Sequence, residues 1–282
     1  MESNREPIVA GQFYPASFGE LDRQIKECFE EHPLGPGAEP GKRKDRVKGV
    51  IAPHAGYAFS GPCAAWSYKA IAESEFPDAY LIIGLNHNGL ESGFSSQDWA
   101  TPFGIVKNHK PLTEALSEAT GIGINNRIHA IEHSIEVQLP FLQYASRDNL
   151  AALRIVPLMI GSRIDFAETA RRINETAERL KKRIVVIASS DFTHYGPAYG
   201  YVPFVTDIKH NMEKLDKGAV KFIADLDSRG FLEYIDQTGA TICGRHPIAL
   251  LIELLKEKTD KVLFEMYYTS GDVMGDYSNA VG

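Results

Sequence analysis

The alternation of short apolar runs with amphipathic segments constrains the fold of this sequence more than any other feature. Near-continuous runs of Val, Ile and Leu are typical of strands that are covered on both faces. Such runs occupy residues 47–52, 79–84, 153–160, 183–188 and 261–269. Segments with apolar residues at helical spacing occupy residues 63–73, 110–120, 134–144, 165–182, 209–224 and 246–258. This order predicts an α/β fold in which helices flank a central, mainly parallel or mixed sheet.

The chain is predicted to form a single layered domain over residues 1–282. Length alone also allows two domains, but α/β domains of this size are common. The one obvious loop, at residues 32–41, is rich in Pro and Gly, and the helix predicted before it, at residues 19–31, is too small to fold alone. Strict alternation ends at residues 205–225 and 228–236, where two successive helices are predicted.

Charge balance and cysteine count argue against several classes of protein. The 30 basic and 37 acidic residues give a net charge of −7, and the only dense basic run is residues 42–46, so no nucleic-acid partner is expected. No apolar run approaches the roughly 18 residues of a membrane span, and the first residues lack the apolar core of a signal peptide. Three widely separated cysteines without a CxxC pair favour a reducing compartment, so a cytoplasmic location without membrane contact is expected.

Histidines and an aspartate follow three of the predicted strands. His54 comes directly after the run 47–52, His87 after the run 79–84, and Asp191 and His194 after the run 183–188. Because the carboxyl ends of parallel strands meet at one edge of a sheet, these side chains are expected to lie close together. Imidazole and carboxylate groups at such an edge predict a metal site or an acid–base site.

Cys243 is the cysteine with the strongest case for chemistry. It lies just before the predicted helix 246–258, beside Arg245 and His246. A helix N-terminus and neighbouring cations both favour thiolate over thiol, so the pKa of Cys243 is expected to lie below its usual value. Cys28 and Cys63 lack such neighbours and are interpreted as structural.

A further pair of candidates lies within the predicted helix 134–144 and just before it. His133 and Glu136 are three residues apart, which places them on one helix face, where a carboxylate can orient an imidazole or both can bind a metal. The same spacing is also common on solvated helices. The remaining histidines without chemical neighbours are interpreted as surface residues: His32, His109, His129 and His210.

Motifs for several common enzyme classes are absent from the sequence. It contains no P-loop, no GxGxxG after a strand, no HExxH helix and no GxSxG elbow. Nucleotide hydrolysis, dinucleotide redox chemistry, zincin proteolysis and α/β-hydrolase chemistry are therefore unsupported. Ser189 and Ser190 have no elbow glycines around them and are not favoured as nucleophiles.

Five motifs in this order resemble the MEMO family, which in prokaryotes is also called AmmeMemoRadiSam system protein B. They are AGQFYP at 10–15, APHAGY at 52–57, EHSIE with LP at 132–140, SSDFTH at 189–194 and TICGRHP at 241–247. The resemblance extends over residues 5–282. Prokaryotic members of this kind are typical of archaea and some bacteria.

The resemblance implies a fold similar to class III extradiol dioxygenases, which hold non-haem Fe(II) with two histidines and one carboxylate. By matching motifs, His54 and His87 occupy the histidine positions, and Cys243 stands where the carboxylate would be. Asp191 and His194 match further pocket residues, with His194 as the acid–base group. Fe(II) is the first expected cofactor, with Cu or Zn as alternatives, because a thiolate is a softer ligand than a carboxylate. His133, Glu136 and Arg245 are expected to border this pocket or to support its ligands.

Two functions from different classes remain open from the sequence. One is a metal-dependent, dioxygenase-like oxidoreductase that acts on an unidentified small molecule. The other is a non-catalytic binding module on a retired dioxygenase fold, which recognises a peptide or protein partner. A plain zinc hydrolase gains little from a thiolate and is disfavoured. The prokaryotic family name also implies a functional link to a radical-SAM protein.

Overall fold

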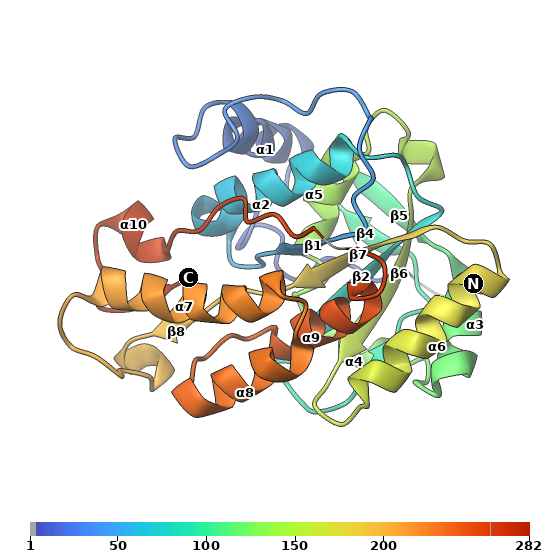
Figure 1. Ribbon diagram of the computed structural model, residues 1–282. Helices are drawn as coiled ribbons and strands as arrows, with labels where there is room; N and C mark the ends of the chain where they lie inside the picture. Colours follow the sequence, from blue (N-terminus) through green and yellow to red (C-terminus); the bar gives the residue numbers. More distant parts are fainter. Residues whose placement is uncertain (1–3, 260) are drawn as a thin grey trace.

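A seven-stranded sheet forms the centre of the computed structural model, which describes residues 4–259 and 261–282 (Figure 1). The strand order is β1-β7-β2-β6-β5-β4, and β3 pairs with β6 beside this path. Neighbours from β1 to β5 run parallel, whereas β4 and β3 are antiparallel to their partners. The strands are β1 (Gly49–Ala52), β2 (Ala79–Leu85), β3 (Gly93–Phe94), β4 (Trp99–Thr101), β5 (Gly104–Asn108), β6 (Arg154–Ile160) and β7 (Ile184–Ser189). The predicted mainly parallel α/β fold is confirmed.

The aliphatic runs form the middle of the sheet because both of their faces are covered. All seven residues of β2 are buried, and β2 pairs with β7 on one side and with β6 on the other. Alternate side chains enter different cores: Tyr80 and Ile82 belong to one apolar cluster, and Leu81 and Ile83 belong to another. This two-sided burial explains why the run contains almost no polar residue.

Helices cover both faces of the sheet. One face is covered by α1 (Phe18–Glu30), α2 (Tyr57–Ala72) and α5 (Gln138–Ala145), and the other by α3 (Lys110–Thr120), α6 (Phe166–Arg179) and α9 (Arg245–Leu255). The two successive helices are α7 (Ile208–Ala224) and α8 (Ser228–Thr238), which share an apolar cluster with α9. Short elements complete the chain: α4 (Asn126–Ala130), α10 (Ser270–Met274), the 3-10 turns Leu150–Ala152 and Pro197–Tyr199, and a ribbon of β8 (His194–Tyr195) with β9 (Ala280–Val281). No helix in the described part of the chain is long and apolar enough to cross a membrane.

Three local predictions differ from the structure. The predicted strand 261–269 has no regular secondary structure and pairs with no strand in the described chain; at its end, the hydroxyl groups of Tyr267 and Tyr268 donate to Asp216 and to the carbonyl of Phe59. The helix predicted from residue 134 begins only at Gln138, because residues 133–137 form turns. The helix predicted from residue 63 begins already at Tyr57 and continues through Pro62.

Candidate metal centre

His54 is the central side chain of the site. It follows β1, is 2% exposed, and its backbone N–H donates to Asp191 Oδ1 at 2.8 Å. Its Nδ1 lies 2.8 Å from Ser189 Oγ, whose own proton is donated to the carbonyl of Ser134 at 2.7 Å. Ser189 Oγ therefore accepts a hydrogen bond from His54 Nδ1–H. This fixes the tautomer and leaves an unprotonated Nε2 that can bind a metal.

Cys243 and Asp191 lie at the free nitrogen of His54. Cys243 Sγ is 3.3 Å from His54 Nε2, and Asp191 Oδ2 is 3.7 Å from the same atom. The loop before α9 can come this close because Gly244 has no side chain: an added Cβ would lie 2.3 Å from Ser190 Cβ. The backbone N–H of Gly244 donates to Ser190 Oγ at 3.1 Å, which ties this loop to the end of β7.

His87 is held from the other side by a buried carboxylate. Its Nδ1 lies 2.9 Å from Glu132 Oε1, and its backbone N–H donates to Glu132 Oε2 at 2.8 Å. The backbone N–H groups of His133 and Ser134 also donate to Glu132 Oε1, at 2.9 and 3.0 Å. Glu132 thus accepts the proton of His87 Nδ1 and leaves His87 Nε2 free, the arrangement typical of a carboxylate that supports a metal-bound histidine.

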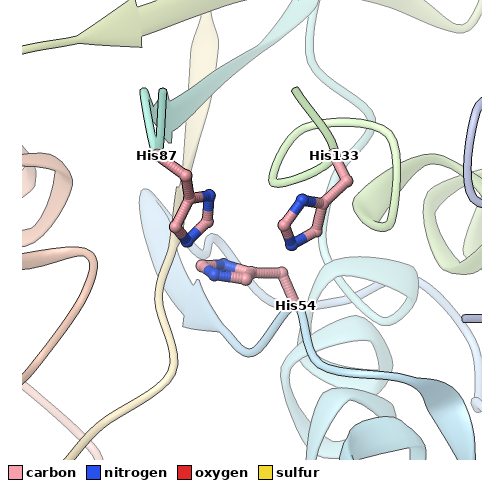
Figure 2. Close-up of side chains that lie close together, drawn as sticks. All are labelled: His54, His87 and His133. Carbon is pink, nitrogen blue, oxygen red and sulfur yellow. The ribbon is translucent and has the colours of Figure 1, made fainter. Parts of the chain in front are cut away.

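His133 completes a group of three imidazoles. Figure 2 shows the rings of His87 and His133 side by side above the ring of His54. Ring centres are 4.8 Å apart for His87 and His133, 5.5 Å for His54 and His87, and 5.6 Å for His54 and His133. Phe13, from the N-terminal AGQFYP motif, packs edge-on against His133 at 4.8 Å, so the N-terminal segment covers one side of the site.

The donor atoms form two overlapping groups. The first group holds a ring nitrogen from each of His54, His87 and His133. The second holds a nitrogen of His54, a carboxylate oxygen of Asp191 and Sγ of Cys243, and within each group these atoms all lie within 4.8 Å of one another. His54 belongs to both groups. The predicted ligand set of His54, His87 and Cys243 therefore falls in neither group as a whole among the described residues: Cys243 lies with His54 and Asp191, whereas His87 lies with His54 and His133.

Burial and hydrogen bonds set the charges of these groups. Burial lowers the pKa of His54 to about 4, although Asp191 acts in the opposite direction, so His54 is neutral at pH 7 as a metal ligand must be. Burial alone would raise the pKa of Glu132, but the His87 side chain and the backbone N–H groups outweigh it and lower that pKa to about 2. The site thus combines a neutral His54 imidazole with a fixed negative charge behind His87.

Comparison with known proteins identifies the family of this chain. A family model described as Memo-like protein matches residues 5–282. The chain belongs to the Memo family. It is 41% identical to a MEMO1 family protein of Methanopyrus kandleri, with 99% of this chain and 96% of that protein aligned. A MEMO1 family protein of Ignicoccus hospitalis is 40% identical, with the same shares aligned, and one of Methanococcus maripaludis is 36% identical, with 99% and 97% aligned.

His194 lies in β8 of this Memo-family chain and is held by backbone carbonyls. Its Nδ1 is 3.0 Å from the carbonyl oxygen of Phe192 and 3.2 Å from that of Thr241, so Nδ1 carries the proton and Nε2 is free. The edge of its ring faces Tyr199, with ring centres 5.1 Å apart. Among the described residues, His194 belongs to neither donor group.

The predicted activation of the Cys243 thiolate is wrong for the metal-free structure of this Memo-family protein. Burial, with a smaller contribution from Asp191, raises the pKa of Cys243 well above its usual value. The expected activating charges are engaged elsewhere: Arg245 pairs with Asp236 at 2.7 Å, and the His246 ring stacks on Phe166. Ligation by Cys243 would therefore require the metal itself to displace the thiol proton.

Glu136 is not a neighbour of His133 on a helix face in this Memo-family structure. The side chain is buried against the N-terminal segment, where it pairs with Arg5 and accepts a hydrogen bond from Tyr14 Oη at 2.7 Å. Arg5 also donates to the carbonyl oxygens of His129 and Glu132, at 3.1 and 2.6 Å. This ion pair therefore anchors the loop that carries Glu132 and His133, and Glu136 acts on the site only through that loop.

Three residues that the sequence analysis did not single out make hydrogen bonds that orient the site in this Memo-family structure. Glu132 and Ser189 each orient one histidine, and Gln138 Nε2 donates to Ser189 Oγ at 2.9 Å. Because Glu132 directly precedes His133 in the sequence, its carboxylate could have been predicted to lie near the histidines. His129, interpreted as a surface residue, is fully buried, and its Nε2 is 3.0 Å from the carbonyl oxygen of Gly93.

Proposed function

We propose that this chain binds one transition-metal ion, with Fe(II) as the first candidate, through His54, His87 and Cys243. The bound ion would serve redox chemistry on a small molecule at the carboxyl edge of the sheet. Membership of the Memo family and the His/Asp/Cys group around His54 support the metal site. The choice of Fe(II) rests on the likeness of the motifs to those of class III extradiol dioxygenases, with Cu and Zn as alternatives.

One observation carries the proposal: the free Nε2 of His54 faces a thiol at ligand spacing. Two bonds of about 2.1 and 2.3 Å from one ion, at about 90–110° to each other, separate their donor atoms by about 3.1–3.6 Å. The distance from Cys243 Sγ to His54 Nε2 is 3.3 Å. Nδ1 of His54 donates to Ser189 Oγ, and Nδ1 of His87 donates to Glu132. In both rings the lone pair of Nε2 therefore points away from that acceptor and is available to a metal.

The donor set fits a metal that takes both imidazole and thiolate ligands. Two neutral imidazoles and one thiolate carry a single negative charge, so a divalent ion keeps a net positive charge. Because they are only three ligands, they leave coordination positions open for water or substrate. A redox metal would supply electron transfer to a bound molecule. The chain itself would exclude water around buried His54 and hold a proton-accepting nitrogen, His194 Nε2, beside the same loop as Asp191.

Metal titration of the protein without added metal tests this proposal. Co(II) serves as a spectroscopic stand-in for Fe(II), because thiolate ligation gives it a ligand-to-metal charge-transfer band. We expect one equivalent to bind with this band, His54→Ala to abolish binding, and Cys243→Ser to remove the band and weaken binding. His210→Ala, at an exposed position on α7, is the matched control and should leave both unchanged.

His133→Ala tests the alternative in which the ion sits among the three imidazoles. If the ligands are His54, His87 and Cys243, this variant should weaken binding by no more than about 10–100-fold, the usual effect of a residue that is not itself a ligand. If His133→Ala abolishes binding while Cys243→Ser keeps full affinity, the ion sits among the three imidazoles and the thiolate assignment is wrong. Full binding of Co(II) by His54→Ala would refute the metal site altogether.

A further inference from the structure

We propose that residues 261–266 form a strap that closes onto the free edge of β1 as an additional parallel strand. This inference does not depend on the proposed metal site. It follows from four features of the described chain: an edge strand with unused backbone groups, a neighbouring segment with a strand-like sequence and exposed apolar side chains, a cavity between the two, and anchors at the end of the segment.

The first feature is the outer edge of β1. This strand pairs only with β7 among the described strands, and the carbonyls of Lys48 and Ala52 accept hydrogen bonds from the β7 side. Because backbone groups alternate along a strand, the N–H groups of Gly49 and Ile51 point to the opposite, open side. Ser67 Oγ donates to the carbonyl of Ile51, so the backbone groups of Gly49 and the N–H of Ile51 remain for another strand.

The second feature is the segment itself. Residues 261–268 read KVLFEMYY, a run of aliphatic and aromatic residues with high strand propensity and without Gly or Pro. In the structure Leu263 and Phe264 are 63% and 52% exposed, although the run resembles the fully buried strand β2. Unpaired edge groups and exposed apolar side chains on adjacent segments are each unfavourable, and pairing would satisfy both.

The third feature is a cavity of about 710 Å³ that separates the two segments. Its walls include residues 45–51 on the β1 side and residues 261–268 on the other, together with apolar side chains of α2, α7 and α9. Ser190, Asp191 and Phe192 line its far end, so the cavity extends behind the loop that carries Asp191. An inward movement of residues 261–266 would fill this space with their apolar side chains.

The fourth feature is a pair of anchors, Tyr267 and Tyr268, which hold the C-terminal end of the segment. Tyr268 Oη donates to the carbonyl of Phe59 and accepts from the N–H of Cys63, both in the first half of α2, which follows the carboxyl end of β1. Tyr267 Oη donates to Asp216 Oδ2 at 2.7 Å. At the other end, Leu255, the last residue of α9, lies against Gly49 at the start of β1. The segment therefore runs in the same direction as β1, and its C-terminal end is already anchored. Figure 1 shows this course as the red trace that passes β1 on the way to α10.

Hydrogen exchange with residue-level mass spectrometry tests the strap in the full-length protein. In solution, alternate amides of residues 261–266 and the amides of Gly49 and Ile51 should exchange at least about tenfold more slowly than unstructured amides. Because alternate N–H groups face a partner strand, either Leu263→Pro or Phe264→Pro must remove a ladder hydrogen bond, and that variant should lose the protection of both strands. Leu263→Thr keeps the N–H and a strand-forming side chain and should retain it.

Each other result would overturn the strap. Exchange of both segments at unstructured rates would mean that the strap does not close. Protection that persists in both proline variants would mean that something other than residues 261–266 covers β1. Protection that disappears on dilution would mean that the edge of β1 pairs with a second copy of the chain. Because Leu263 and Phe264 are exposed, proline at either position should leave the remaining fold intact, which circular dichroism would verify.

Discussion

Replacing Glu132 with Gln should destabilise the protein by about 3 kcal/mol at pH 7. The substitution keeps the shape of the side chain but removes the charge that accepts hydrogen bonds from His87, His133 and Ser134. The pKa of Glu132 is about 2 in the fold against an ordinary value of 4.5, and each pKa unit corresponds to about 1.36 kcal/mol. The side chain is 1% exposed, so solvent screening does not reduce this value much.

The pH dependence of this difference is the sharper test. Because the folded pKa is depressed, the stabilisation is fully present above pH 4.5 and is lost as the pH falls through 2. The difference between the wild type and Glu132→Gln should therefore shrink from about 3 kcal/mol at pH 7 to about 1.4 kcal/mol at pH 3. Urea unfolding of the metal-free proteins measures it, with Glu114→Gln, exposed on α3, as the control. Equal stability at pH 7, or a difference that stays constant down to pH 3, would show that the charge of Glu132 does not stabilise the fold.

Two further predictions concern buried groups outside the ligand set. Arg5→Met should lower the free energy of unfolding by about 3–5 kcal/mol, since it leaves Glu136 as an unpaired buried charge; a loss under about 1 kcal/mol in urea unfolding would contradict the anchoring role. In the native metal-free protein, iodoacetamide should modify Cys28, Cys63 and Cys243 far more slowly than free cysteine, because burial raises the pKa of all three thiols. Peptide mapping would show rapid labelling of Cys243 if its thiolate is present after all.

The sheet and the strand-end residues were predictable because both follow from short-range pattern. An aliphatic run without polar interruption has few places in a fold other than a strand covered on both faces, as β2 shows. Once parallel strands are assigned, the residues after them must meet at one edge, which is why the sequence alone was enough to place His54 close to His87 and close to Asp191. The run 261–269 has the same local pattern, and whether it pairs depends on tertiary placement that the pattern does not contain.

The charges of the site were not predictable because they depend on burial and on distant partners. A helix N-terminus beside Arg245 suggested a thiolate at Cys243, but burial of the thiol outweighs that effect and Arg245 binds Asp236 instead. Glu136 was interpreted from its spacing to His133, yet its partner is Arg5, which lies 131 residues away in the sequence. Local spacing could not show this pairing, because the contact exists only after the N-terminal segment has folded over the loop.

Metal ligands are easier to find in a sequence than the residues that orient them. A ligand must be a histidine, cysteine or carboxylate, whereas an orienting group needs only an acceptor at the correct place. At His54 that acceptor is the hydroxyl of Ser189, and it serves only because its single proton is already donated to the carbonyl of Ser134. If Ser134 turned its carbonyl away, Ser189 could donate to His54 Nδ1 instead, and the proton would move to Nε2, the nitrogen that faces Cys243. The metal-binding state of His54 is therefore decided by a backbone carbonyl 80 residues along the chain, in the turn that precedes α5.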